Sequence, residues 1–210
     1  MLKIVPVILI VFLTSNSETF SQAQLNTGLI GVDVNAFGRL RIFTPSTNDT
    51  RHIDRLSILV GTSPSEVFDY YNDSDIEDTT VLISETTEAD FIIYGSYNNL
   101  YSGLPPNILH KLFVYGWNNL PYIILKNVII NREETAINVK IGLDIVTQLN
   151  GTYGYDTVQF SFENNIIDIK KVTHIGIKLL SHPLSSLYSF EWYSGYMADT
   201  SYWQWLNHQM

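Results

Sequence analysis

The sequence predicts an all-β protein: an antiparallel β-sandwich of about a dozen strands, followed by a short C-terminal helix. Two observations predict this class. β-branched and aromatic residues dominate most of the chain, and such residues favour the pleated, half-buried surface of a sheet. Apolar segments are also separated by turn-forming residues and do not alternate with helical segments, which argues against a doubly wound fold.

The predicted strands can be followed along the chain. Residues 28–34 and 38–43 form a first pair, and arginine alternates with apolar residues in the second of these, which indicates a sheet with one wet face. The clearest block is 109–146, where three strands joined by turns at 118–121 and 131–135 are expected to form an antiparallel meander. The other expected strands are residues 53–60, 66–71, 91–94, 157–162, 166–170, 174–180 and 188–192.

The end of the chain is rich in aromatic residues. A helix is expected over residues 198–208, with Asp199 or Thr200 as its cap, although these aromatics also suit a docked loop. The sequence stops at Met210, directly after this cluster. Two interpretations stay open: the aromatics close the core as a lid, or the sequence is C-terminally truncated.

The first 23 residues have the three parts of a secretory signal peptide. Lys3 precedes an apolar stretch at 4–13, and Ser21-Gln22-Ala23 forms a small-x-small cleavage site. Cleavage before Gln24 leaves residues 24–210 as a single β-sandwich domain, which is secreted, periplasmic or on the cell surface. The apolar stretch is shorter than the roughly 20 residues that span a bilayer, and no other segment approaches that length, so no membrane insertion is expected after cleavage. The chain has no cysteine, which excludes disulfides and thiol catalysis and favours a bacterial source.

The charge of the chain argues against nucleic acid as a partner. The formal net charge is −9, and nine acidic residues without any Lys or Arg lie between Glu66 and Asp90. Contacts to phosphate supply much of the affinity for nucleic acid, and they require a basic surface. An anionic membrane surface is disfavoured for the same reason.

Parts of the sequence resemble a known group of proteins. The stretch FGRLRIFTP…IDRLSILVG, followed by VFDYYND, is similar to the opening of large exported β-sandwich proteins of Bacteroidota-like bacteria, often described as type IX secretion cargo. KNVIINREETAINVKIGLDI and WYSGY…WQWLN are similar to later segments of these proteins. The resemblance implies a structural or binding role outside the cytoplasm. A more distant similarity, at the level of fold alone, is to the supersandwich of galactose-mutarotase-like and carbohydrate-binding proteins.

The acidic segment at 69–78 contains candidate calcium ligands. Asp73, Asp75 and Glu77 lie at alternate positions, and hard oxygen ligands at this spacing suit a structural Ca²⁺. The segment lacks the glycine and the final glutamate of an EF-hand loop. The alternative is a solvated loop whose like charges extend it. No other cofactor is expected.

Aromatic residues provide the candidate ligand-binding surface. Tyr94, Tyr97, Tyr115 and Trp117 lie close to asparagine pairs in the sequence. Aromatic faces beside amide groups are typical of surfaces that bind sugars, so a glycan or a surface polymer is the expected partner. The alternative is that these residues are simply good strand formers.

The competing function is a carbohydrate-active enzyme of mutarotase-like or glycosidase type. Its acid and base would be His110 and His174 with a carboxylate such as Glu133. The sequence has no HExxH motif and no Gly-x-Ser-x-Gly elbow to mark another catalytic centre. A non-catalytic binding or structural role is therefore favoured over an enzyme, and a scaffold part without its own ligand is a third interpretation.

Overall fold

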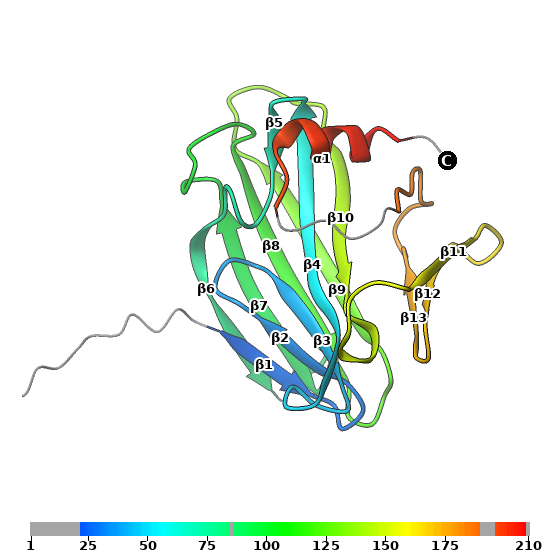
Figure 1. The fold of residues 1–210 in the computed structure, drawn as a ribbon. Helices are drawn as coiled ribbons and strands as arrows, with labels where there is room; N and C mark the ends of the chain where they lie inside the picture. The colour runs from blue at the N-terminus through cyan, green and yellow to red at the C-terminus, as the bar shows by residue number, and fades with distance from the viewer. Residues whose placement is uncertain (1–21, 85, 190–195, 209–210) are drawn as a thin grey trace, which may run out of the picture.

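The computed structural model describes residues 22–84, 86–189 and 196–208. These residues form thirteen β-strands in three antiparallel sheets, one short 3-10 turn and one α-helix (Figure 1). The all-β class with a short C-terminal helix, predicted from the sequence, is therefore confirmed.

The first sheet joins strands from both halves of the chain. Its order is β1–β2–β3–β4–β10, and β5 pairs with the end of β4. Strand β4 is the longest and organises the sheet, because β3 and β5 pair with it and β10 runs along most of its length. The strands are β1 (Ala23–Asn26), β2 (Gly31–Val34), β3 (Leu40–Thr44), β4 (Thr50–Ser63), β5 (Glu66–Phe68) and β10 (Lys140–Thr147).

The second sheet is a meander with the order β6–β7–β8–β9. A third, smaller sheet follows the 3-10 turn η1 (Leu149–Gly151) and has the order β11–β12–β13; Figure 1 shows it beside the sandwich. The strands of the second sheet are β6 (Asp75–Ser84), β7 (Phe91–Asn98), β8 (Ile108–Gly116) and β9 (Ile123–Asn131). Those of the third are β11 (Thr157–Ser161), β12 (Ile166–Lys170) and β13 (His174–Lys178).

The main core lies between the first and second sheets. Val34 and Leu56 of the first sheet belong to the same buried cluster as Ile93, Leu112 and Val114 of the second. Successive residues of a strand point to opposite faces, so each strand that supplies core residues also presents an outer face. The outer faces of the two sheets therefore decide which side chains can meet a ligand.

The structure differs from the predicted strands in three details. The third strand of the expected meander, β10, leaves β9 and pairs with β4 of the other sheet, with Leu143 opposite Ile58. Residues 132–139 are long enough to cross between the sheets, and the crossing packs the partly buried Leu143 against both core clusters. Strand β6 was not predicted, because acids and threonines hide its pattern. The expected strand at 188–192 is absent at the described residues 188 and 189, and its remainder lies outside the described residues.

The helix α1 (Asp199–Leu206) covers part of the outer face of the first sheet (Figure 1). Tyr202 is 1% exposed and packs with Leu59 and Val67. Gly142 makes this approach possible, because a Cβ there would lie 2.5 Å from Leu206 Cδ2. Ala198, not Asp199 or Thr200, is the N-cap residue. No helix among the described residues is long and apolar enough to cross a membrane.

Candidate functional site

The outer face of the second sheet carries three aromatic side chains in a row. Tyr94 of β7 lies opposite Phe113 of β8, and their ring centroids are 4.9 Å apart. Tyr115 is two residues further along β8, with its ring 6.3 Å from Phe113 and nearly parallel to it. All three side chains are half-buried. Tyr94, Phe113 and Tyr115 are called the aromatic row below.

Neighbouring strands widen the aromatic row. Directly opposed residues of antiparallel strands share a face, so Val81 of β6, which pairs with Tyr94, belongs to the same surface. Val81 is 41% exposed. On the other side Lys126 of β9 lies opposite Phe113, with its ammonium 5.5 Å from the ring centroid. Exposed apolar surface with a polar rim is typical of an interaction site.

Hydrogen bonds fix the orientation of Tyr94. Its hydroxyl donates to Asp78 Oδ2 at 2.6 Å, and the Ser96 hydroxyl donates to the same oxygen at 2.7 Å. These two bonds hold the pKa of Asp78 below its usual range. Burial, together with the Asp78 carboxylate, raises the pKa of Tyr94, and burial with the Glu88 carboxylate raises the pKa of Tyr115. Both phenols therefore stay neutral and act as hydrogen-bonding groups near neutral pH.

The four predicted ligand-binding residues do not share one surface. Tyr94 and Tyr115 lie in the aromatic row, and Trp117 follows β8 with its ring 5.6 Å from Tyr122. Tyr97 belongs to the core instead: it is 0% exposed, and its hydroxyl bonds to Thr80. The prediction for Tyr97 is corrected, because residues 94 and 97 of one strand point to opposite faces.

Sequence reasoning missed Phe113, which lies between the two tyrosines of the row. The signal was present in the alternation of β8, where Lys111, Phe113 and Tyr115 occupy the outer positions and Leu112 and Val114 the core positions. Reading that period of two would have placed Phe113 beside Tyr115.

The predicted calcium ligands are bound to other groups. Asp73 is buried and accepts a hydrogen bond from the Asp69 N–H, while Asp75 accepts from the Ile76 N–H. Glu77 forms a two-point ion pair with Arg132, and this pair holds the pKa of Glu77 down at about 2. Among the described residues no group of three or more His, Cys, Asp or Glu is placed to hold a metal ion.

The candidate catalytic residues are also kept apart. His110 lies in the core next to Tyr97, bonds to Asn127 Oδ1, and has its pKa lowered to about 4 by burial. His174 begins β13 of the third sheet, and Glu133 accepts a hydrogen bond from the Asn107 N–H. Within the described part of the chain no hydrogen bond or ion pair joins any two of the three. A histidine with so low a pKa is also not a proton donor near neutral pH.

A second aromatic surface is concave. It is a cleft of about 410 Å³ between the β2–β3 turn, the β5–β6 loop, the β7–β8 loop and Tyr196, which precedes α1. Tyr70, Tyr71, Tyr101 and Tyr196 line it. It is called the tyrosine cleft below. Tyr70, Tyr71 and Tyr196 were not predicted to bind a ligand.

The chain is thus an antiparallel β-sandwich with one open and one concave aromatic surface. Comparisons with protein-family models, curated proteins and solved structures found no match. Any functional conclusion therefore rests on the geometry of these two surfaces.

Proposed function

We propose that this protein is an exported, non-catalytic binding module that holds a glycan or another surface polymer on the aromatic row. The observation that most supports this is the set of three half-exposed rings, placed side by side on adjacent strands of one sheet face. Sugar rings present apolar C–H faces that stack on aromatic rings, and their hydroxyls seek hydrogen-bonding groups at the rim.

The rigidity of the row favours binding. Phe113 and Tyr115 alternate with core residues of β8, so their backbone is fixed between β7 and β9. Asp78 already holds the Tyr94 hydroxyl before any ligand arrives. A surface ordered in advance loses little conformational entropy on binding, so more of the contact energy remains as affinity.

The rim of the row carries groups of both signs. Lys111 and Lys126 lie on the outer positions of β8 and β9, and Asp78 lies beside Tyr94. These groups can donate to and accept from sugar hydroxyls. The mixture favours a glycan of low net charge over a strongly charged polymer, because neither sign dominates.

Export is the second part of the proposal, and it rests on the sequence of residues 1–23 together with the resemblance to exported β-sandwich proteins. Residues 1–21 lie outside the described residues. Cleavage before Gln24 would remove Ala23 from β1 and leave Gln24–Asn26 paired with β2. The intact mass of protein recovered from the medium or the cell surface tests this, and a mass that includes residues 1–23 would contradict export by cleavage.

The binding experiment uses affinity electrophoresis against neutral and charged polysaccharides, with isothermal titration on the best of them. Phe113→Ala should weaken binding about tenfold, because it removes the central ring of the row. Phe162→Ala is the matched control, since Phe162 is 77% exposed and lies in the β11–β12 turn of the third sheet, away from the aromatic row. Equal affinity of these two variants, or release of a product from the polysaccharide, would contradict the proposal.

A further inference from the structure

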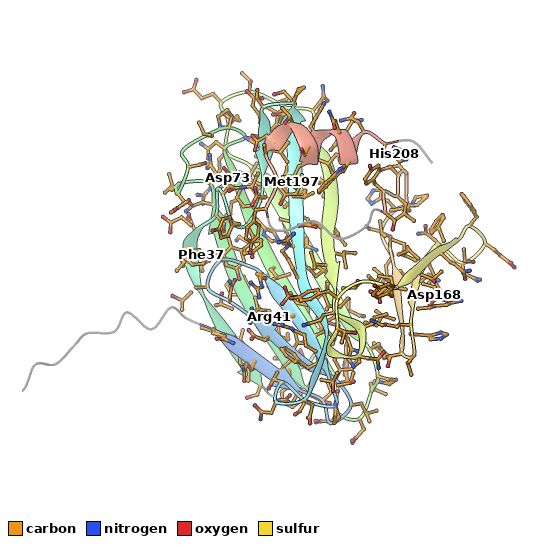
Figure 2. All side chains as sticks on the ribbon, viewed as in Figure 1. Phe37, Arg41, Asp73, Asp168, Met197 and His208 are labelled. Carbon is orange, nitrogen blue, oxygen red and sulfur yellow. The ribbon has the colours of Figure 1, made fainter. Side chains whose placement is uncertain are left out.

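The tyrosine cleft is shaped for a small ligand. Its volume of about 410 Å³ falls within the range of small-molecule sites, roughly 300–1,000 Å³. Its walls come from segments far apart in the sequence: Phe37 and Arg39 follow β2, Tyr70 follows β5, and Tyr196 precedes α1. Figure 2 shows Phe37, Asp73 and Met197 grouped on the side of the sandwich where the chain enters α1.

Three tyrosines form a fixed wall of the cleft. The rings of Tyr71 and Tyr196 are stacked, with centroids 3.6 Å apart and an interplanar angle of 2°. Tyr70 meets both rings edge-on, and its hydroxyl bonds to the hydroxyl of Tyr196. Tyr71 is 55% exposed and Tyr101 is 72% exposed, so both rings keep surface that a ligand can cover.

The acids of the β5–β6 loop are turned inward and support this wall. Asp69 Oδ1 accepts from the N–H groups of Tyr71 and Asn72, and Asp73 accepts from the N–H of Asp69. Both carboxylates are therefore occupied by the backbone of their own loop. The segment that the sequence assigned to calcium instead presents tyrosines to the cleft.

A cluster of arginines reaches the cleft through Arg39. The lining of the cleft includes Arg39 and no carboxylate. Behind Arg39, three guanidinium groups surround Asp54: Arg51 at 2.7 Å, Arg39 at 3.5 Å and Arg41 at 3.6 Å. Asp33 lies 3.9 Å from Arg41, so the cluster holds three positive and two negative charges. Arg39 is the charged side chain of the lining itself, and a guanidinium can pair with an anionic group of a ligand.

Polar side chains complete the lining. Asn35, Asn72 and Ser74 add amide and hydroxyl groups around the aromatic wall. The β2–β3 turn that carries Asn35 is ordered, because Asn35 Oδ1 accepts from the N–H groups of Phe37 and Arg39. Ser74 donates to the Phe37 carbonyl and ties this turn to the β5–β6 loop. The site is therefore built before a ligand arrives.

We infer that the tyrosine cleft binds a hexuronic acid residue of an acidic glycan, with the sugar ring on Tyr71 and Tyr101 and its carboxylate on Arg39. A guanidinium donates two parallel hydrogen bonds to a carboxylate, which a neutral sugar cannot receive in the same way. The site lies on different loops from the aromatic row, so it goes beyond the proposed function and can fail independently of it.

The test compares oligogalacturonate with its methyl ester, which has the same backbone but no charge. Titration calorimetry on the full mature chain should show about tenfold tighter binding of the acid, because the ester loses the charge-assisted bonds to Arg39. The preference should shrink between ~0.05 and ~0.5 M salt. Equal binding of acid and ester, or binding of neither, overturns the inference.

Variants separate the cleft from the rest of the surface. Tyr101→Ala should weaken oligogalacturonate binding about tenfold without affecting folding, since Tyr101 is largely exposed. Tyr155→Ala is the matched control, because Tyr155 is 97% exposed and lies outside the cleft.

Arg39→Gln should remove the preference for the acid over the ester. Phe113→Ala should leave uronate binding intact, whereas a loss in Phe113→Ala but not in Tyr101→Ala would place uronate binding on the aromatic row and overturn the assignment.

Discussion

The outer faces of the two main sheets arise from the same alternation along their strands, but they carry different kinds of side chain. On the first sheet the outward positions carry charged residues, and α1 and Tyr196 cover part of them: Arg55 and Asp144 pair at 2.8 Å, both side chains are 7% exposed, and the Tyr196 ring lies 4.7 Å from the Arg55 guanidinium. On the second sheet the outward positions carry the half-exposed aromatic row. Charge is thus buried on one face and aromatic surface is left open on the other.

This contrast shows which residues stabilise the fold and which are available for binding. A buried ion pair is costly to break, because the remaining partner keeps its charge away from water. An open aromatic row adds little to the stability that the core already gives the fold, and it leaves apolar surface exposed. The buried Arg55–Asp144 pair is therefore structural, and the open aromatic row is the candidate for binding.

The largest effect expected from this contrast is on stability. Asp144→Ala should lower the free energy of unfolding by ~3–5 kcal/mol, because it removes the buried carboxylate that pairs with Arg55 at 2.8 Å. Glu77→Ala removes the exposed ion pair with Arg132 and should cost less than ~1 kcal/mol. Urea unfolding of both variants measures the difference. Equal losses would show that the two faces are not distinct.

The buried His110, in the core between the two sheets, should make the stability of the fold sensitive to acid. Burial lowers the pKa of His110 to about 4, whereas an unfolded histidine titrates near ~6.5. The stability from the neutral imidazole is present above pH ~6.5 and is lost as the pH falls towards 4, by up to about 3 kcal/mol. Asp73 acts in the opposite direction, because burial raises its pKa to about 6 and its protonated form favours the fold.

Comparison with a His110→Gln variant isolates the histidine, since both proteins keep Asp73. Urea unfolding between pH 4 and 7 should give a flatter profile for the variant. If the free energy of unfolding of the wild type changes with pH just as that of the variant does, the pKa of His110 is the same in the folded and the unfolded state. That result would contradict the prediction.

A smaller effect is expected where α1 covers the first sheet. Gly142→Ala places a methyl group 2.5 Å from Leu206 Cδ2 and should cost ~1–3 kcal/mol, because the Leu206 side chain must repack under α1. Gly176→Ala is the control, since its nearest neighbour would be an ordinary contact at 3.7 Å. Urea unfolding followed by tryptophan fluorescence reports on α1 through Trp203 and Trp205. Identical curves for the two variants would contradict the close packing assigned to Gly142.

The sequence predicts where most strands lie better than it predicts which strands pair with one another. The alternation in β8 was readable because each residue type follows its exposure. The same pattern in β10 shows that one face is buried but does not show against which sheet, so its pairing with β4 was missed. Strand β6 was missed because its exposed residues are acids and threonines, which resemble a loop.

The candidate sites show the same limit. The parity of residues 94 and 97 could have excluded Tyr97, because strand geometry is local. The tyrosine cleft could not have been predicted in this way. Its stack joins Tyr71 to Tyr196, which lies far along the chain, and only the packing of α1 brings them together. The acidic loop was misread because a carboxylate that binds its own backbone has the same sequence spacing as one that binds calcium.

The most direct test maps the ligand onto the two outer faces. Amide chemical shifts of isotope-labelled protein can be followed while the best-binding neutral glycan is added. The shifts should concentrate on β7, β8 and β9 around Tyr94, Phe113 and Tyr115, and should leave α1 and the outer face of β4 unchanged. Shifts centred on β4 and α1, or no shifts at concentrations where the glycan is retained in electrophoresis, would contradict the aromatic row as the binding surface.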